Sequence, residues 1–243
     1  LISHRNVPPE KLLILTFTDK AATELRTRIS NRLTALDIRF NLNEMYLGTF
    51  HSICLRILEE FREFTRLRRN YSLMDEFDQQ YLLYQKQKKF DSIENLELLT
   101  GDPGRTSSWA LSSKLLNWIN KVSEEAIDPN ELVKSHHPEI KALGEACNLY
   151  HQLISEENAL DFSTIQYEAL TLLRSHESIR SQLRERFEYV MVDEYQDTNT
   201  IQELILRELT GEKPNLCVVG DDDQGLYRFR GASIRNILQF RDQ

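Results

Sequence analysis

Two adjacent carboxylates, Asp193 and Glu194, directly follow a run of four apolar residues at 189–192. Such a run places both carboxylates at the carboxyl end of a buried strand, which is the edge where open α/β sheets bind their ligands. There, one acid can hold Mg²⁺, which takes oxygen ligands and usually keeps several waters. The next acid can orient or deprotonate an attacking water. This is the pattern of a Walker B strand, although an acid after a strand often only caps the following helix.

A second apolar run, at 216–219, ends in Gly220, three consecutive acids at 221–223 and Gln224. Glycine permits a tight exit from the strand. Three neighbouring acids repel one another unless a cation or basic groups lie nearby. Gln224 offers a neutral donor and acceptor for a phosphate or a water. A solvated acidic loop is the alternative interpretation, and we favour it for Asp222.

Aromatic and basic residues interleave just beyond this segment, at 227–231. Flat rings stack on bases without sequence preference, and arginine neutralises phosphate or stacks as well. The alternative is a strand–helix turn with Tyr227 and Phe229 in the core.

Two further segments offer similar chemistry before a helical pattern. Residues 16–20 provide Phe17, two hydroxyls, a base and a helix amino end, which attracts phosphate. Residues 48–52 provide Thr49 and His51 after a short apolar run at 45–47. Each of these two side chains, taken alone, is more often a helix cap or a satisfied histidine than a ligand.

The elements that must position these residues form an α/β pattern. Apolar runs at 12–17, 189–192 and 216–219 do not alternate with polar residues, which is typical of strands buried on both faces of a parallel sheet. Apolar residues at helical spacing follow the first two runs, and strand–helix alternation indicates an α/β fold. We expect Thr18 or Asp19 to cap the first helix and Asp197 or Thr198 the second.

The middle of the chain shows helical patterns and no convincing buried strand. One expected helix there carries Phe77, Tyr81, Leu82 and Tyr84, and a later one begins near Trp109. The sequence therefore predicts an all-helical insertion over 52–186. The α/β domain would comprise 1–51 and 187–243.

Composition narrows the class of protein further. Of 243 residues, 40% are hydrophobic and 28% charged, which excludes a collagen-like or wholly disordered chain. No apolar run approaches the roughly 20 residues that cross a bilayer. Three scattered cysteines favour a reducing, cytoplasmic setting. The net charge of −8 means that any nucleic acid must be bound by a local groove and by stacking rather than by the overall field.

Five segments occur in a characteristic order: LTFTDKAATELRTRI, GTFHSICLRIL, DFSTI, VDEYQDTNTIQ and VVGDDDQGLYRFRGA. In them the sequence resembles the N-terminal half of a superfamily-1A DNA helicase of the UvrD/Rep/PcrA type, across nearly the whole chain. The resemblance implies a DNA-dependent ATPase that uses Mg²⁺, moves along single strands, generally 3′ to 5′, and separates duplexes in repair or recombination. It also implies a RecA-like parallel sheet flanked by helices (domain 1A) with a helical inserted subdomain (1B).

The same resemblance assigns roles to individual residues. Asp193 would serve magnesium, Glu194 the catalytic water, and Gln224 the terminal phosphate of ATP, coupling hydrolysis to DNA. The residues expected to line the single-strand path are Phe17, Thr49, His51, Tyr227, Phe229 and Arg230.

The sequence also departs from the family pattern. Asp19, Gly225 and Phe229 stand where relatives often carry Asn, Ser and Trp; we expect Asp19 to cap its helix instead of approaching phosphate. No GxxxxGK[ST] loop occurs, and the family places that phosphate cradle just upstream of the segment that begins at Leu1. We therefore expect a fragment without ATP hydrolysis of its own, with further helicase domains upstream and downstream. Its partners would be single-stranded DNA and duplex junctions, without a membrane.

Two other functions remain open from the sequence. One is a non-catalytic DNA-binding or scaffolding module that has lost its phosphate loop. The other is the motor part of a helicase–nuclease subunit. Retention of the two acids and Gln224 favours the motor over a scaffold.

Overall fold

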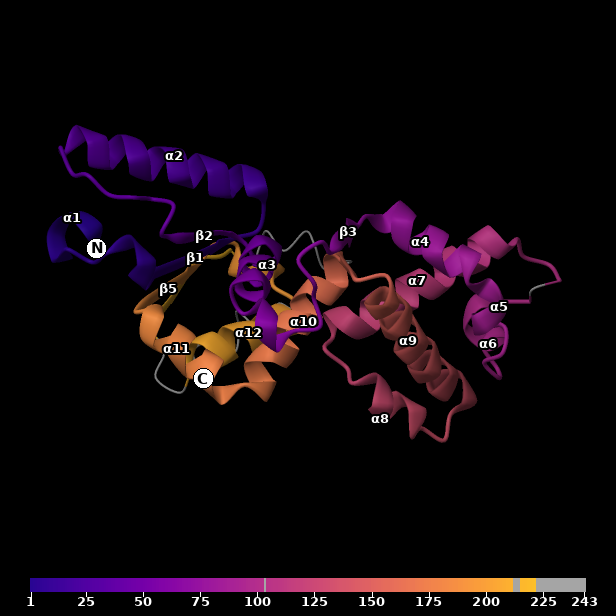
Figure 1. Cartoon of the computed structure of the whole chain (residues 1–243). Helices are drawn as coiled ribbons and strands as arrows, with labels where there is room; N and C mark the ends of the chain where they lie inside the picture. The colour runs from indigo at the N-terminus through magenta and orange to yellow at the C-terminus, as the bar shows by residue number, and fades with distance from the viewer. Residues whose placement is uncertain (103, 212–214, 222–243) are drawn as a thin grey trace. The chain divides into compact units, whose positions relative to one another are not determined.

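The computed structural model describes residues 1–102, 104–211 and 215–221 (Figure 1). Contacts divide the chain into two compact units. The first unit comprises Leu1–Phe61 and Glu168–Gln243, and the second comprises Arg62–Tyr167. Four residues predicted to contact nucleotide or DNA lie outside the described residues: Gln224, Tyr227, Phe229 and Arg230.

The first unit contains a four-stranded sheet in the order β2-β1-β5-β6. All three strand pairs are parallel, as the continuous apolar runs predict. The strands are β1 (Leu12–Thr16), β2 (Tyr46–Thr49), β5 (Tyr189–Val192) and β6 (Leu216–Val218). Every residue of β1 and β2 is buried, because helices cover both faces of these strands.

Helices flank the sheet on its two sides. α2 (Asp19–Ala35) and the short α1 (Ile2–Arg5) pack with Leu12 and Ile14 of β1 on one face. On the other side lie α11 (Glu177–Arg186) and α12 (Thr200–Thr210) (Figure 1). α3 (Phe50–Glu60) packs against β1 and β2, and a 3₁₀ turn, η1 (Pro9–Lys11), leads into β1.

Helix capping agrees with the sequence at one helix and not at the other. The hydroxyl of Thr18 accepts from the Ala21 amide and caps α2, so Asp19 is in the first turn and is not the cap. α12 is capped by Asn199 in a reciprocal capping box with Gln202, so the prediction of Asp197 or Thr198 is wrong. The reason is an additional buried 3₁₀ turn, η3 (Tyr195–Asp197), which delays the start of the helix.

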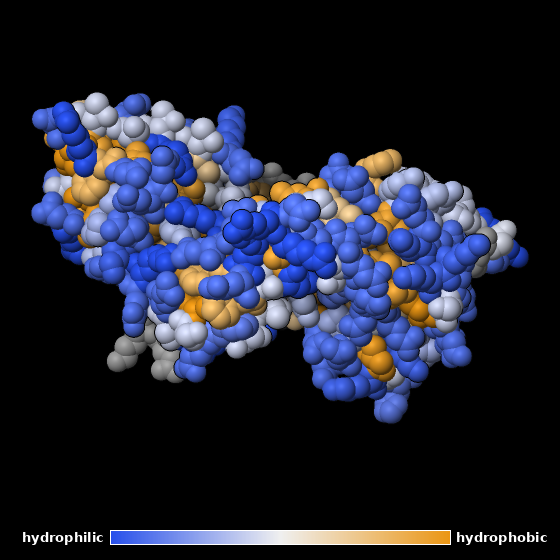
Figure 2. All heavy atoms as spheres, in the orientation of Figure 1, coloured by the Kyte–Doolittle hydropathy of each residue, from blue (hydrophilic) through white to orange (hydrophobic). Residues whose placement is uncertain are grey.

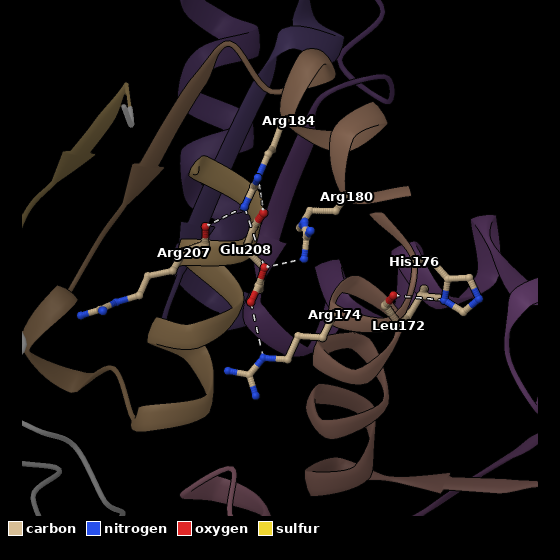
Figure 3. Close-up of polar contacts among 7 residues, drawn as sticks. All are labelled: Leu172, Arg174, His176, Arg180, Arg184, Arg207 and Glu208. Carbon is tan, nitrogen blue, oxygen red and sulfur yellow. Dashed lines mark hydrogen bonds and ion pairs between the residues drawn. The ribbon is translucent and has the colours of Figure 1, made fainter. Parts of the chain in front are cut away.

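One carboxylate joins three elements of the first unit (Figure 3). Glu208, near the end of α12, lies 3.4 Å from Arg174 of α10 (Phe162–Ser175) and 3.3 Å from Arg180 of α11. Arg184 of α11 lies 3.8 Å from the same carboxylate, and its Nε donates to the Glu208 carbonyl at 2.7 Å. The side chain of Glu208 is only 20% exposed. This Glu208 cluster therefore fixes α12 against α10 and α11.

The second unit is mostly helical but contains a short parallel pair of strands. β3 (Ser72–Met74) pairs with β4 (Ala159–Asp161), so the prediction of an all-helical insertion is wrong in this respect. Strands of three residues leave no apolar run long enough to recognise, and β3 is largely exposed. The unit boundaries, 61/62 and 167/168, fall inside the 52–186 range predicted for the insertion, because α3 and α11 pack within the first unit.

The helices of the second unit enclose a core of their own. Its members include Leu83, Leu116, Ile119, Tyr150 and Ile154, all at most 2% exposed. The helical elements are η2 (Arg62–Phe64), α4 (Glu76–Gln85), α5 (Gln87–Phe90), α6 (Glu97–Thr100), α7 (Ser108–Glu124), α8 (Pro129–Val133) and α9 (Pro138–Glu156). In the part of the chain that the structure describes, every helix is too short or too polar to span a bilayer.

Candidate functional site

The carboxyl ends of the strands in the first unit lie side by side along one edge of the sheet. Leu15 of β1 pairs with Val192 of β5, which in turn pairs with Val218 of β6. On the other side of β1, Thr16 pairs with Thr49 of β2. The chain segments that carry Phe17, Asp193 and Asp221 therefore all leave the sheet at this edge, as expected for the ligand side of an α/β sheet.

The two acids after β5 differ in their setting. Asp193 is half-buried, and its amide donates to the Leu15 carbonyl at 2.9 Å, which continues the strand pairing. Glu194 is exposed and has left-handed backbone angles, φ 52° and ψ 46°. A non-glycine residue in this region stores backbone strain of about 1–3 kcal/mol, and such residues cluster at functional sites. The strained turn reverses the chain into the buried η3 and leaves the Glu194 side chain at the edge.

Gln196 is a site residue that the sequence motifs did not identify. Its side chain is 1% exposed, and its Nε2 donates to the Glu194 carboxylate at 2.6 Å. Its Oε1 accepts from the Asp221 amide at 3.0 Å. One amide thus joins the catalytic candidate after β5 to the segment after β6. The only sequence signal for this role was the position of the glutamine, two residues beyond Glu194. Its burial became visible in the structure.

Backbone hydrogen bonds reinforce this connection between β5 and β6. The Tyr195 amide donates to the Val219 carbonyl at 2.9 Å, and the Val219 amide donates to the Val192 carbonyl at 2.8 Å. Burial, with a smaller contribution from Glu203, raises the pKa of Tyr195 to about 12, so its hydroxyl stays neutral at physiological pH. The turn that follows the two acids is therefore packed and uncharged at Tyr195.

Three of the predicted DNA-contacting residues lie within the described residues, where β1 and β2 end: Phe17, Thr49 and His51. Phe17 and His51 are half-buried, and Thr49 is 9% exposed. The Thr49 hydroxyl accepts from the Ser52 amide at 3.3 Å and caps α3, which matches the structural alternative for this residue. A cap occupies one lone pair of the hydroxyl and does not test its role toward DNA. The roles of Phe17, Thr49 and His51 stay predictions.

These elements define a class of protein. A parallel sheet flanked by helices, with two acids at the carboxyl end of a strand whose residues alternate between half-buried and buried, is consistent with a RecA-like α/β domain. Comparison of the sequence with families of known proteins narrows the class. The model of the UvrD/REP helicase N-terminal domain matches residues 1–243. The chain therefore belongs to the UvrD/REP helicase family and corresponds to its N-terminal domain.

Individual relatives carry helicase names. The chain is 34% identical over 251 residues to the ATP-dependent DNA helicase UvrD1 of Mycobacterium tuberculosis. It is 30% identical over 243 residues to the ATP-dependent DNA helicase PcrA of Bacillus subtilis, and 31% identical over 242 residues to a probable DNA helicase II homolog of Mycoplasma capricolum. Each match covers 99% of this chain but only 30–31% of the relative.

Proposed function

We propose that this chain is part of the motor of an ATP-dependent DNA helicase that translocates on single-stranded DNA, 3′ to 5′, and unwinds duplexes in repair or recombination. The observation that carries the proposal is the shared edge of the sheet in the first unit. This edge brings the Asp193–Glu194 pair into one row with the segments that carry Phe17, Thr49 and His51. A motor needs a rigid connection between the site of ATP hydrolysis and the path of the DNA. Strands that share one edge of a sheet provide such a connection.

The acids suit magnesium. Mg²⁺ is usually held by one or two carboxylates together with substrate phosphates and waters, so it needs no all-protein cage. Asp193 and Glu194 provide such oxygens, and no group of three or more His, Cys, Asp or Glu side chains converges within the described residues. Asp193 would hold the ion that accompanies ATP, and Glu194 would orient the attacking water. Gln224 is the proposed contact of the terminal phosphate.

The proposed track for DNA relies on stacking. With a net charge of −8, the chain gains little from its overall field, whereas an aromatic ring stacks on a base for roughly 1–3 kcal/mol. We assign the first unit to domain 1A and the second to subdomain 1B. The other motor parts, including the phosphate loop that this sequence lacks, would come from the rest of the longer protein. The three free cysteines support the cytoplasmic setting that we propose.

The test uses the longer protein that carries this chain. Glu194→Gln keeps the size of the side chain but removes the carboxylate. We expect phosphate release in the presence of single-stranded DNA to fall at least 100-fold, whereas the affinity for a labelled oligothymidine changes less than twofold. Glu24→Gln, an exposed acid on α2, is the matched control and should keep full turnover.

Three outcomes contradict the proposal. Turnover that survives Glu194→Gln removes the role of this residue. A wild-type protein that binds single strands but never hydrolyses ATP is instead a binding module. Hydrolysis without any response to DNA leaves an ATPase that is not a DNA motor.

A further inference from the structure

Four aromatic rings of the second unit are exposed on neighbouring helices. Phe77, Tyr81 and Tyr84 lie on α4 with exposed fractions of 61%, 44% and 44%, and Trp109 lies at the start of α7 with 38%. Most of the surface in Figure 2 is hydrophilic, with hydrophobic side chains gathered in separate patches. Contiguous exposed apolar groups on a folded domain mark interaction sites more often than scattered single residues do. We call these four residues the ring cluster.

The rings touch one another and form a continuous surface. Phe77 stacks on Tyr81 with a centroid distance of 6.1 Å and an interplanar angle of 7°. Trp109 joins Phe77 at 5.6 Å and Tyr84 at 5.8 Å. The side-chain amide of Gln80 donates to the Trp109 carbonyl at 2.9 Å and ties the two helices together beside the rings. The surface is therefore preorganised, which lowers the entropy cost of binding.

The other face of α4 fixes this exposure. Gln79, Leu82 and Leu83 are buried at 3%, 5% and 2%, and the helix packs against α7. Rotation of α4 to bury the rings would expose this core face to water. The sequence predicts a helix that carries Phe77, Tyr81, Leu82 and Tyr84, and of these four residues the structure buries Leu82 alone. Within the described residues, the four rings keep exposed fractions of 38–61%.

Charges beside the rings indicate the kind of partner. Asp75, Glu76 and Asp78 are exposed at the start of α4, and within the described residues no basic side chain forms an ion pair with them. The Asp75 and Asp78 carboxylates cap α4, each accepting from the backbone amide of the other. Both stay exposed, and together with Glu76 they border the rings with negative charge, which attracts cations.

We propose that the ring cluster, with the acids at the start of α4, binds an arginine-containing segment of a partner protein. Guanidinium groups stack on aromatic rings and pair with carboxylates, so arginine satisfies both features at once. The phosphates of nucleic acid would meet the three acids and be repelled. A second copy of this chain would bring its own acids toward the same acids. This surface acts independently of the proposed helicase function.

The experiment measures binding of synthetic peptides to the longer protein at 0.15 M salt. The probe is a fluorescein-labelled 12-residue peptide of alternating Arg and Ser; the comparison probes are its Glu–Ser counterpart and a 12-nucleotide oligothymidine. We expect Trp109→Ser and Phe77→Ser each to weaken Arg–Ser binding about 10-fold, and Glu76→Gln to weaken it about threefold. Trp118→Ser is the matched control, because Trp118 is 44% exposed on the same helix but lies outside the ring cluster. It should change the affinity less than twofold.

Several results would overturn the proposal. Unchanged affinity in both Trp109→Ser and Trp118→Ser would show that the peptide merely follows the negative charge of the protein. Competition by the Glu–Ser peptide, or by oligothymidine in a way that Trp109→Ser abolishes, would assign the ring cluster to another class of partner. Self-association of the wild-type protein that Trp109→Ser removes would assign it to a second copy. Thermal melting of each variant separates misfolding from loss of binding, and Tyr81→Ser repeats the test if Trp109→Ser fails to fold.

Discussion

Glu194 and Glu208 are two carboxylates of the same unit with opposite surroundings. Glu208 is 20% exposed and lies within 4 Å of three guanidinium groups from α10 and α11. Glu194 is exposed, and its hydrogen-bond partner within the described residues is the neutral amide of Gln196. The charge of Glu208 is neutralised by these arginines, and the ion pairs hold α12 against α10 and α11. Within the described residues, the charge of Glu194 is oriented by Gln196 and has no cationic partner, so its carboxylate suits the role toward a metal ion or a water that we propose.

The backbone makes the same distinction. Glu208 lies within a regular helix, whereas Glu194 has a left-handed conformation. Strain of about 1–3 kcal/mol persists only where the surroundings enforce it. Here the surroundings are the buried η3 and the hydrogen bonds between the exits of β5 and β6. An exposed carboxylate on a strained backbone fits the catalytic role that we propose for Glu194.

The largest expected effect comes from removing the orientation of Glu194. Gln196→Met keeps the volume of the buried side chain but loses both hydrogen bonds. In the longer protein we expect kcat for ATP hydrolysis to fall about 100-fold, since a misplacement of about 1 Å costs this much, whereas KM for ATP changes less than threefold. Steady-state kinetics with saturating single-stranded DNA measures both constants.

A second variant at this position separates the two hydrogen bonds. Gln196→Glu retains an acceptor for the Asp221 amide but places a second carboxylate beside Glu194. We expect its kcat to fall as well, with partial recovery at low pH as one of the paired acids binds a proton. If both variants keep wild-type kcat, Gln196 is a packing residue and Glu194 needs no orientation.

The next effect tests the other carboxylate. Glu208→Gln leaves three arginines facing a neutral amide, and breaking a buried ion pair costs about 3–5 kcal/mol. Since these side chains are 20–47% exposed, we expect a smaller loss, about 2 kcal/mol of unfolding free energy. Urea unfolding of the variant measures it. Turnover per folded molecule should not change; a fall in kcat would blur the distinction between Glu194 and Glu208.

A third carboxylate, that of Glu60, stabilises the fold as Glu208 does, and it makes the free energy of unfolding depend on pH. Arg186 donates to Glu60 at 2.6 Å, and this hydrogen bond holds the pKa of Glu60 below its ordinary value. Its stabilisation is therefore present at neutral pH and is lost as pH falls through the lowered pKa. Glu60→Gln should cost about 0.5–1 kcal/mol at pH 7 and less at acidic pH. Melting temperatures of the wild type and of Glu60→Gln at several pH values measure the difference.

The smallest effect distinguishes two arginines of the Glu208 cluster. Arg174 is 47% exposed and Arg180 is 22% exposed. Arg174→Ala should cost under about 0.5 kcal/mol, as exposed pairs do, and its effect should vanish in 1 M salt. Arg180→Ala should cost more and respond less to salt. If calorimetry finds that both variants lose the same unfolding free energy, burial does not decide how much each arginine contributes.

Much of the first unit could be predicted from its sequence. Continuous apolar runs at β1 and β5 have one stable solution, a parallel sheet covered by helices, and this places Asp193 and Phe17 at the same edge without further information. The start of α12 could not be predicted, because η3 buries the polar residues Gln196 and Thr198 through tertiary contacts. A capping rule that reads only local sequence assigns such residues to the surface.

The second unit was less predictable for a similar reason. β3 and β4 span three residues each and lie far apart in the sequence, so their pairing has no local signal. The apolar residues Phe77, Tyr81, Leu82 and Tyr84 predict the helix α4, yet the helix is apolar on both faces and buries the one with Leu82 and Leu83. Periodicity identifies the helix but does not choose between two apolar faces.

The left-handed conformation of Glu194 has a consequence for engineering. Glycine adopts this conformation without a steric penalty, and asparagine does so more readily than glutamate. A selection for heat resistance alone would therefore drift toward these residues at position 194 and remove the carboxylate to which we assign the catalytic water. Stability libraries of this family need an activity filter at this codon.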